Sequence, residues 1–394
     1  MFNRLVGAGL AAAALAVAPI VPSVVSAQPS AQGQAHSARV CAAPVPSSAA
    51  CDALIRTDVN HSSTVNPAGY HPNDLQSAYN LPSSTAVPSQ TVAIVDAYDD
   101  PYAASDLSTY RSQFGLPACT TAGTNPCFKK VNQNGQASPL PRANGGWAQE
   151  ISLDLDMVSA ICPNCHILLV EASSASLANL GTAVRTAAAL HATEISNSYG
   201  GGDAPDSTYS FYYNQPGIAV VASSGDSGYG TEYPASSAYV TAAGGTSLRN
   251  ASNLRGWSET AWSGAGSGCS SYNPTPSWQT APTGCSMRAE ADVSAVADPN
   301  TGVSVYDSYS YQGFRGWLEF GGTSVASPII ASVYALAGGE PAGSSAAGYA
   351  YSHASSLNDV TQGSNGSCGP RLCDAGTGWD GPTGLGTPNG TGAF

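Results

Sequence analysis

The chain has 394 residues, of which 10% are charged, and its formal net charge is −13 at pH 7. Ordinary soluble domains are about 25% charged, and only 13 residues of this chain are Lys or Arg. Such a chain lacks a basic patch that could neutralise phosphates, so we expect no nucleic-acid partner. A sparse charge set also suits acidic solution, because few basic groups repel one another once the carboxylates are protonated.

Residues 1–27 have the pattern of a secretory signal peptide. Arg4 precedes a run of Ala, Leu and Val, and the small residues Val-Ser-Ala end at Ala27, where we expect cleavage. The run is short for a membrane span and is broken by Pro19 and Pro22, and no later stretch is long and apolar enough to be one. We therefore expect a soluble, secreted, extracellular protein that has no membrane partner and is a monomer.

All ten cysteines follow the expected signal peptide. An even number of cysteines in an exported protein favours a set of disulfides. Their spacing suggests pairs of near neighbours in the chain, although the sequence alone does not establish the connectivity. The suggested pairs are Cys41–Cys51, Cys119–Cys127, Cys162–Cys165, Cys269–Cys285 and Cys368–Cys373.

Residues 28–65 are rich in Ser, Ala, Pro and Gln, which predicts a short propeptide or a disordered N-terminal segment. Ordered structure is expected to begin near the stretch GYHPNDLQSAYNLP, which starts at Gly69. We expect residues 66–394 to form one domain, which is large but feasible for a single α/β unit.

Within this domain, apolar β-branched runs alternate with helical patterns. Continuous apolar strands separated by helices imply an α/β fold with a mainly parallel sheet covered by helices on both faces. Residues 250–320 are rich in Gly, Ser and Tyr and predict long loops with short strands. The expected strands are 91–98, 166–172, 194–200, 217–225 and 239–245, and the expected helices are about 101–114, 147–161 and 174–190.

Two carboxylates fall in the apolar stripe of the helix expected over 147–161. At about 100° per residue, Glu150 and Asp154 lie about 40° apart in the middle of that stripe, whereas Asp156 lies on the opposite, polar face. Buried carboxylates are costly unless they are paired or hydrogen-bonded, and an i, i+4 pair can share a proton or a hydrogen bond. The alternative is that Glu150 and Asp154 are surface residues. For Asp156 the pattern does support a position on the surface.

The sequence GGTS occurs twice, so this motif is weak by itself. Gly244–Ser247 runs into a stretch without helical pattern and predicts a plain turn, whereas Gly321–Ser324 runs into the apolar helical pattern VASPIIASVYALAG. A serine at a glycine-flanked helix start has free backbone N–H groups and the positive end of the helix dipole nearby. A nucleophile with a developing oxyanion needs these features. A simple N-cap serine is the alternative for Ser324.

Three motifs, in one order along the chain, are similar to those of a known family. GTSVASP at 322–328 resembles the serine motif of the subtilisin-like fold, but none of the six histidines has the His-Gly-Thr-like setting of a subtilisin. Glu150-x-x-x-Asp154 instead resembles the acidic pair of the sedolisins, or serine-carboxyl peptidases. The stretch SSGDSG resembles their oxyanion motif, which puts Asp226 in that role. The resemblance covers about residues 70–390.

This resemblance implies a subtilisin-like α/β domain and a set of catalytic roles. Ser324 would attack the scissile carbonyl, Glu150 would take its proton and pass it to the leaving amine, and Asp154 would hold Glu150. Asp226 would be protonated and would donate a hydrogen bond to the oxyanion. Because the ordinary pKa of a glutamate is about 4.3, such a base is matched to acidic pH. We therefore expect an acid-active endopeptidase that hydrolyses protein or peptide substrates.

The C-terminal region resembles the calcium loop of the same family. The stretch NDV at 358–360 is followed by GTGWDGPTGLGTP at 376–388. Its spacing is not that of an EF-hand, but a ligand set made only of oxygen suits a hard cation. The resemblance implies one structural Ca²⁺. Its ligands, carried over from the family, are Asp359, Val360, Gly376, Gly378 and Asp380.

The chain departs from the family in three places. Sedolisins usually carry a large folded prodomain, whereas only residues 28–65 stand between the expected signal and the expected domain. Asp96 occupies a strand-end position where some relatives carry an acid that extends the catalytic chain, and a structural or loop-capping role is the alternative. Tyr199 stands where some relatives carry tryptophan.

Other functions remain open from the sequence. CPNCH at 162–166 matches the haem-attachment pattern, and the alternative is a structural disulfide followed by a histidine that begins a strand. Zinc binding by the same cysteines is disfavoured, because the sequence has no second cysteine pair at zinc-finger spacing. A non-catalytic secreted binding protein on a peptidase fold is another class, and a histidine-dependent subtilisin with a neutral pH optimum is a third.

Overall fold

The computed structural model describes residues 1–3, 37–59, 66–85, 90–123, 126–340 and 345–394. The expected signal peptide lies outside the described residues except for its first three, and the part of the expected leader over 28–36 and 60–65 also lies outside them. The described helices and strands belong to the unit Ala35–Phe394. No described helix is both long and apolar enough to cross a membrane.

The central sheet consists of strands β4 (Thr91–Ala97), β5 (Phe128–Asn132), β6 (His166–Ala172), β7 (Glu194–Asn197), β9 (Ala219–Ser223), β11 (Thr241–Asn250), β12 (Trp257–Ala261) and β15 (Val293–Val296). Its strand order is β12-β11-β9-β7-β4-β6-β5, and β15 pairs with β11. These pairings are parallel except for that of β11 with β12. The mainly parallel sheet predicted from the apolar runs is confirmed.

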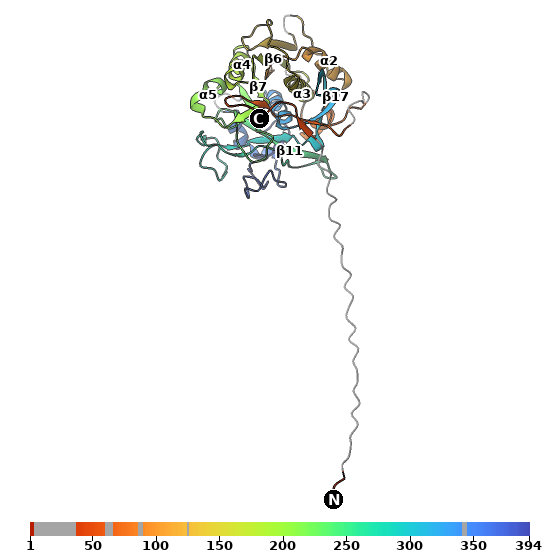
Figure 1. The fold of residues 1–394 in the computed structure, drawn as a ribbon, viewed down its shortest axis with the longest axis vertical. Coiled ribbons are helices and arrows are strands. Elements are labelled where there is room, and N and C mark those ends of the chain that lie inside the picture. The colour runs from red at the N-terminus through yellow and green to blue at the C-terminus, as the bar shows by residue number, and fades with distance from the viewer. Residues whose placement is uncertain (4–36, 60–65, 86–89, 124–125, 341–344) are drawn as a thin grey trace. The chain divides into compact units, whose positions relative to one another are not determined.

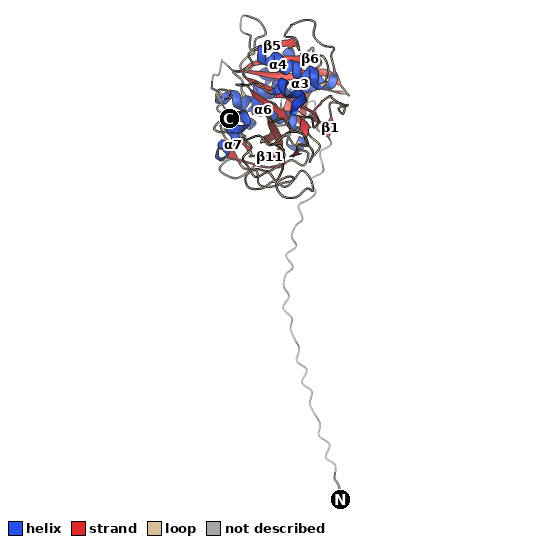
Figure 2. Ribbon diagram, turned by 90° about the vertical axis from the view of Figure 1, so that its left-hand side faces the viewer, coloured by secondary structure: helices blue, strands red, loops and turns tan. Residues whose placement is uncertain are grey.

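Helices cover both faces of this sheet. Figure 1 shows α4 and α5 on one side of β6 and β7, and α2 and α3 on the other, while Figure 2 shows α6 within the same layered arrangement. The helices are α1 (Pro72–Ala78), α2 (Ala103–Gln113), α3 (Gly145–Ile161), α4 (Leu177–Ala189), α5 (Asp206–Tyr213), α6 (Thr323–Ala337) and α7 (Ala346–Ser352), with short 3-10 turns η1 (Pro299–Thr301) and η2 (Ala354–Ser356).

Smaller sheets surround the central one. Strands β16 (Val303–Tyr311) and β17 (Phe314–Gly321) form a hairpin that is longer than the short strands expected over 250–320. The alternation of Val and Tyr with Ser and Asp along VSVYDSYSY explains this hairpin, since period-two patterning suits a half-buried strand. The other strands are β8 (Tyr199–Gly202), β10 (Glu232–Tyr233), β13 (Gly268–Cys269), β14 (Ala289–Glu290), β18 (Leu357–Asn358) and β19 (Thr387–Pro388).

Ordered structure begins before residue 66. The expectation that residues 28–65 are a loose segment is therefore wrong for residues 37–59. These residues form β1 (Ser37–Arg39), β2 (Ala50–Cys51) and β3 (Leu54–Arg56). β2 pairs with β8, and β3 pairs with β17 and β1. Short strands of this kind are added through backbone hydrogen bonds to existing sheet edges, so their composition carries little hydrophobic periodicity that a sequence pattern could detect.

The five predicted disulfides are confirmed, and the described residues contain no free cysteine. In the motif CPNCH, Cys162 and Cys165 form a disulfide. Strand β6 begins at His166, whose ring Nδ1 is within hydrogen-bond distance of the carbonyl oxygen of Pro126. Because both sulfurs are bonded to each other, these cysteines do not attach a haem or bind zinc as thiolates.

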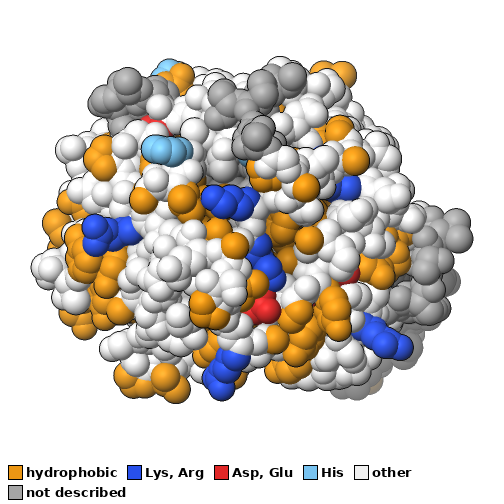
Figure 3. Space-filling model, turned by 90° about the horizontal axis from the view of Figure 1, so that it is seen from above, with side chains coloured by type: hydrophobic (Ala, Val, Ile, Leu, Met, Phe, Trp, Pro, Cys, Tyr) orange, Lys and Arg blue, Asp and Glu red, His pale blue; other side chains and the backbone are white. Residues whose placement is uncertain are grey.

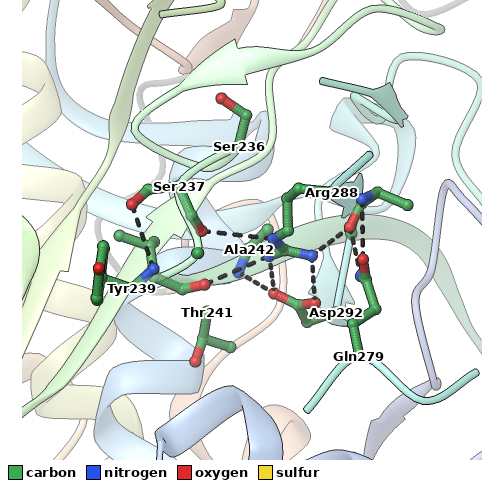
Figure 4. Close-up of polar contacts among 12 residues, drawn as sticks. Ser236, Ser237, Tyr239, Thr241, Ala242, Gln279, Arg288 and Asp292 are labelled. Atoms are coloured by element: carbon green, nitrogen blue, oxygen red, sulfur yellow. Dashed lines mark hydrogen bonds and ion pairs between the residues drawn. The ribbon is translucent and has the colours of Figure 1, made fainter. Parts of the chain in front are cut away.

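A buried ion pair ties the loops before β15 to the central sheet. Arg288 and Asp292 are fully buried, and Figure 4 shows their side chains face to face. Asp292 also accepts a hydrogen bond of 2.8 Å from the backbone N–H of Ala242 in β11. Burial of charge requires such pairing. On the surface, charged side chains are sparse, as Figure 3 shows for one face.

Candidate active site

Helix α3 carries Glu150 and Asp154 into the interior. The helix begins after Asn144, whose side chain accepts a hydrogen bond of 3.2 Å from Trp147 N–H and so caps it. Helices α2 and α6 and strand β16 pack against it. Both carboxyl groups are fully buried. The structure therefore bears out the sequence argument that these two carboxylates face the core.

Asp156 was expected on the surface, and this expectation is wrong. Its carboxyl group is buried and accepts a hydrogen bond of 2.8 Å from Tyr306 N–H of β16. The helical pattern assigns it to the polar face, but that face is covered by β16 and α2 rather than by water. A local period cannot show that a helix is enclosed on all sides.

Ser324 lies in the first turn of α6, after Gly322 with a backbone φ of +99°. A glycine adopts this conformation without strain. The Ser324 hydroxyl donates to the carbonyl oxygen of Ser198 at 3.2 Å. The hydroxyl of Ser198 in turn donates to Asp154 Oδ1 at 2.7 Å. Because α3 and α6 pack together, the predicted serine and the predicted acidic pair meet at one place.

Glu150 is the carboxyl group beside the serine. Neither of its oxygens accepts a hydrogen bond within the described residues. Burial raises the pKa of Glu150 well above its ordinary value, and the charges of Asp154 and Asp96 raise it further. The Ser324 hydroxyl is near enough to lower this pKa, although it donates its hydrogen bond to Ser198 instead.

Asp96 extends the acidic group. It lies near the end of β4, is fully buried, and both its oxygens lack a hydrogen-bond partner among the described residues. Burial raises the pKa of Asp96, and its charge raises the pKa of Asp154 and of Glu150. Three carboxyl groups that repel one another's charge cannot all ionise, so the group retains protons.

Asp226 lies on the other side of the α6 N-terminus. Its Oδ1 accepts hydrogen bonds from the backbone N–H of Thr323 at 2.7 Å and from the Thr323 hydroxyl at 2.9 Å. Its Oδ2 has no partner among the described residues, and a Cβ at Gly322 would lie 2.6 Å from it. Burial and the charge of Asp52 raise the pKa of Asp226 well above its ordinary value. A protonated Oδ2 would therefore be a free donor beside Gly322, at the start of the helix that carries the serine.

Two residues at this site were not identified from the sequence. The backbone N–H of Ser324 donates a 2.9 Å hydrogen bond to the carbonyl oxygen of Asp52, and Ser198 joins Ser324 to Asp154. Ser198 follows the end of β7, where polar residues of parallel sheets gather. The position of Ser198 at the end of a predicted strand could therefore have indicated a functional residue. Nothing in the composition of 37–59 pointed to Asp52.

The C-terminal loop brings the two predicted acidic ligands together. Asp359 Oδ2 accepts a hydrogen bond of 3.0 Å from Gly378 N–H, and Asp380 Oδ2 accepts one of 3.0 Å from Gly376 N–H. The carboxylate of Asp380 on this Gly-rich turn and that of Asp359, which the turn contacts, offer oxygen donors of the kind that Ca²⁺ prefers. The described residues hold no cluster of three or more His, Cys, Asp or Glu side chains for a metal. The residues thus fit a site completed by backbone carbonyls.

The parallel sheet, with a serine at the start of α6, belongs to the subtilisin-like class of α/β folds. A model of the subtilase family, Peptidase S8, matches residues 131–347. Kumamolisin of Bacillus sp. (strain MN-32) is 30% identical over 84% of this chain, and sedolisin of Pseudomonas sp. (strain 101) is 27% identical over 81%. The chain belongs to the subtilase family and, within it, to the sedolisins.

A solved structure supports the same assignment. Pseudomonas sedolisin, described as a serine-carboxyl proteinase complexed with two molecules of pseudo-iodotyrostatin, matches with a TM-score of 0.66 and 26% identity. The match covers 82% of this chain and 96% of that one. Tripeptidyl-peptidase 1 of Bos taurus is 31% identical to this chain, in a match that covers 44% of this chain and 36% of the length of that protein. The chain spans 64% of the length of kumamolisin and 60% of that of sedolisin.

Proposed function

We propose that the chain is a secreted serine-carboxyl peptidase that hydrolyses protein or peptide substrates in acid. The observation that carries the proposal is the meeting of Ser324 with the fully buried carboxyl groups of Glu150 and Asp154. Family membership supports a serine-type peptidase. A serine nucleophile needs a base, and Glu150 is the carboxyl group whose pKa the Ser324 hydroxyl lowers.

In the proposed reaction Ser324 Oγ attacks the scissile carbonyl while Glu150 accepts its proton. Glu150 then delivers that proton to the leaving amine, and in the second half-reaction it activates water to release the acyl group. Asp154 accepts the hydrogen bond of Ser198 through Oδ1, which leaves Oδ2 available to Glu150. Asp154 is in this scheme the residue that orients the base, as the aspartate does in a Ser-His-Asp triad.

The oxyanion would be stabilised by the backbone N–H of Ser324 and by protonated Asp226. Thr323 fixes Oδ1 of Asp226 as an acceptor, so the proton belongs on Oδ2. Ionisation of Asp226 would replace a donor with a like charge and end catalysis. Protonation of the Glu150–Asp154 pair would remove the base. Activity is therefore expected to be bell-shaped in pH, with its maximum in acid.

We also propose one structural Ca²⁺ at the C-terminal loop. Asp359 and Asp380 would supply carboxylate oxygens, and Val360, Gly376 and Gly378 would supply backbone carbonyls. When bound, the ion would neutralise the two acids and fix the loop. The proposal rests on the two carboxylates that the Gly376–Asp380 turn brings together.

Secretion is supported by the five disulfides, which persist in oxidising compartments. We further propose endopeptidase action. Relatives also include proteins named tripeptidyl-peptidases. The size of the first peptides released from a substrate distinguishes endopeptidase from tripeptidyl-peptidase action. Release of tripeptides from the N-terminus would contradict it, whereas internal fragments of mixed length would support it.

The test is cleavage of a denatured protein substrate from pH 2 to pH 8 by the purified chain and by Ser324→Ala. Activity confined to acid and lost in the variant is the expected result. A maximum at neutral pH would contradict the carboxyl base and favour a histidine-dependent enzyme. Substrate binding without cleavage at any pH would favour the second candidate, a catalytically silent binding protein on this fold.

A further inference from the structure

Thr323, the first residue of α6, makes three polar contacts with the turn that carries Asp226. Its backbone N–H donates to Asp226 Oδ1 at 2.7 Å, and its hydroxyl oxygen lies 2.9 Å from the same carboxyl oxygen. The backbone N–H of Gly225 donates to the Thr323 hydroxyl oxygen at 3.1 Å. All three residues are buried. Thr323 therefore joins the start of the helix that carries Ser324 to the turn after β9.

The Gly225 N–H fixes the direction of the Thr323 hydroxyl. A backbone N–H only donates, so the Thr323 oxygen accepts from Gly225, and its single hydrogen is left for Asp226 Oδ1. Oδ1 then receives two donors and serves as an acceptor. When the Asp226 carboxyl group is neutral, its proton consequently lies on Oδ2, which has no partner among the described residues.

The turn is anchored on its other side, which keeps the Gly225 N–H directed at Thr323. Gly266 N–H donates to Gly225 O at 2.8 Å, and the Ser224 hydroxyl donates to Gly266 O at 2.9 Å. Gly225 has a backbone φ of +107°, which glycine adopts without strain. The hydroxyl of Thr323 is thus oriented by a fixed backbone rather than by a flexible side chain.

Asp226 Oδ2 lies on the side where a peptide carbonyl meets the serine. The carbonyl oxygen of Asp52 accepts from Ser324 N–H at 2.9 Å and so marks the position of a carbonyl oxygen at this N–H. A Cβ at Gly322 would collide with that oxygen and would lie 2.6 Å from Asp226 Oδ2. The two oxygens therefore lie against the same glycine, and the proton on Oδ2 is the one directed toward an oxyanion there.

We propose that Thr323 is the positioning residue of the oxyanion donor: its hydroxyl confines the proton of Asp226 to Oδ2 and sets the highest pH at which the chain is active. This inference rests on the proposed function and adds to it the residue that governs the alkaline limit of the same site. The Thr323 hydroxyl is used by Gly225 and Asp226. Its effect on the reaction therefore passes through Asp226.

The Thr323 hydroxyl favours the productive geometry of Asp226 but the unproductive charge state. Burial raises the pKa of Asp226, whereas the hydrogen bonds from the Thr323 N–H and hydroxyl lower it. The oxyanion donor must be neutral, so activity is lost as the pH rises through this pKa. Loss of the hydroxyl alone should therefore move the alkaline limb of activity to higher pH. For a hydrogen bond to a charged group, the expected shift is about one to two pH units.

Three other charged groups face Asp226. The charge of Asp52, between β2 and β3, raises the pKa of Asp226, and that of Arg39 on β1 lowers it. Glu232 on β10 is near enough that the charge of Asp226 raises its pKa. A substitution that removes only the Thr323 hydroxyl leaves these three groups unchanged, so a shift of the alkaline limb reports on the hydroxyl itself.

The test is the pH profile of kcat/KM for Thr323→Val and Thr323→Ser, measured on a peptide that the wild type cleaves. Valine keeps the branched shape of threonine but lacks the hydroxyl, whereas serine keeps the hydroxyl. Thr323→Val is expected to move the alkaline limb upward by about one to two pH units. It should also lower the maximum of kcat/KM several-fold, because the proton is no longer confined to Oδ2. Thr323→Ser is expected to restore the wild-type limb.

Thr241→Val is the matched control, because Thr241 is a buried threonine at the start of β11 whose hydroxyl lies beside Tyr334 rather than Asp226. It should leave the alkaline limb in place. An unchanged or lowered limb in Thr323→Val would overturn the inference and leave the proposed function intact. Absence of acid activity from the wild type would defeat the proposed function, and the inference with it.

The Asp226→Asn background separates positioning from a general effect on the fold. The amide does not titrate, so addition of Thr323→Val should move the limb of that variant no further. An equal upward shift in this background would assign the effect to another group and would overturn the inference.

Infrared spectroscopy gives a readout that needs no turnover. In the Ser324→Ala background, the carboxyl C=O band that Asp226→Asn removes reports protonated Asp226. Its titration should move to higher pH when Thr323→Val is added, or Thr323→Ala if the valine variant does not fold. A band that titrates at the same pH with and without the Thr323 hydroxyl would contradict the proposed role of this residue.

Discussion

Ser198 Oγ donates a 2.7 Å hydrogen bond to Asp154 Oδ1, and the carbonyl of the same serine accepts the Ser324 hydroxyl. Ser198 thus stabilises ionised Asp154, and this hydrogen bond lowers the pKa of Asp154 against the effect of burial. Hydrogen bonds to charged groups contribute about 1.5–3 kcal/mol. In Ser198→Ala the first ionisation of the Glu150–Asp154 pair should therefore move up by about one to two pH units.

The measurement is the acid limb of the pH profile of kcat/KM, which should shift upward in Ser198→Ala. Ser332→Ala is the matched control, because Ser332 is a buried serine in α6 whose hydroxyl has no partner within the described residues. An unchanged acid limb together with a lower Tm would mean that Ser198 has only a structural role.

Substitution of three neighbouring acids on α3 can distinguish catalytic carboxyl groups from structural ones. Glu150→Gln and Asp154→Asn should each lower kcat by about 10²–10⁴-fold, because each removes part of the base. Asp156→Asn retains the acceptor for Tyr306 N–H and should keep kcat within a few-fold of wild type. Equal losses in all three variants, measured on folded protein, would show that the helix needs these acids for structure alone.

The acidic pair and the serine could be predicted because their signals are local. Glu150 and Asp154 stand out against an apolar helical period, and Ser324 follows glycines at a helix start. The disulfides were predictable for the same reason, since each pair is close in the chain. The parallel sheet followed from runs such as 166–172, which matches β6 in full.

The remaining features depend on contacts between distant residues. Ser198 reaches Asp154 across 44 positions, and Asp52 reaches Ser324 through backbone atoms that no side-chain pattern encodes. Asp156 was assigned to the surface because a helical period does not reveal the hairpin β16–β17 that covers it. Backbone pairing at a sheet edge also explains why the strands within 37–59 were missed.

Asp226 offers a test of the oxyanion donor. In Asp226→Asn, the amide oxygen can accept from Thr323 while the amide nitrogen replaces the protonated Oδ2 as a donor. The amide does not titrate, so the alkaline limb of kcat/KM should move to higher pH. Asp226→Ala should instead lose about 10²–10³-fold in kcat. An alkaline limb at the same pH in Asp226→Asn and wild type would assign that limb to another group.

Calcium should stabilise the folded chain if the C-terminal loop binds it. Addition of Ca²⁺ at about 100 times its Kd contributes about 2.7 kcal/mol to the free energy of unfolding, and chelation removes that contribution. The measurement is Tm with Ca²⁺ and with EDTA for the wild type, Asp359→Ala and Asp380→Ala. A Ca²⁺-dependent Tm in the wild type that is lost in both variants is expected, and an equal response in all three would place the ion elsewhere.

The buried carboxyl groups away from the site predict that the fold itself is most stable in acid. Burial raises the pKa of Glu194 to about 8, although the hydrogen bond from Thr193 lowers it. Burial likewise raises the pKa of Asp307 to about 8 and that of Asp100 to about 7. Groups whose pKa is higher in the folded state favour folding most below their ordinary values near 4, and this contribution is lost as the pH rises through 7 to 8.

Glu194→Gln tests this dependence without touching the active site, since Gln keeps an acceptor for the Thr193 hydroxyl but does not ionise. Its free energy of unfolding should be close to that of wild type at about pH 4 and higher by a few kcal/mol at pH 8. The exposed Asp374→Asn serves as control and should change neither value. Chemical denaturation of the Ser324→Ala background at both pH values avoids self-digestion. Equal stability of Glu194→Gln and its parent at pH 8 would show that Glu194 ionises freely, with water or a rearrangement of β7 relieving its burial.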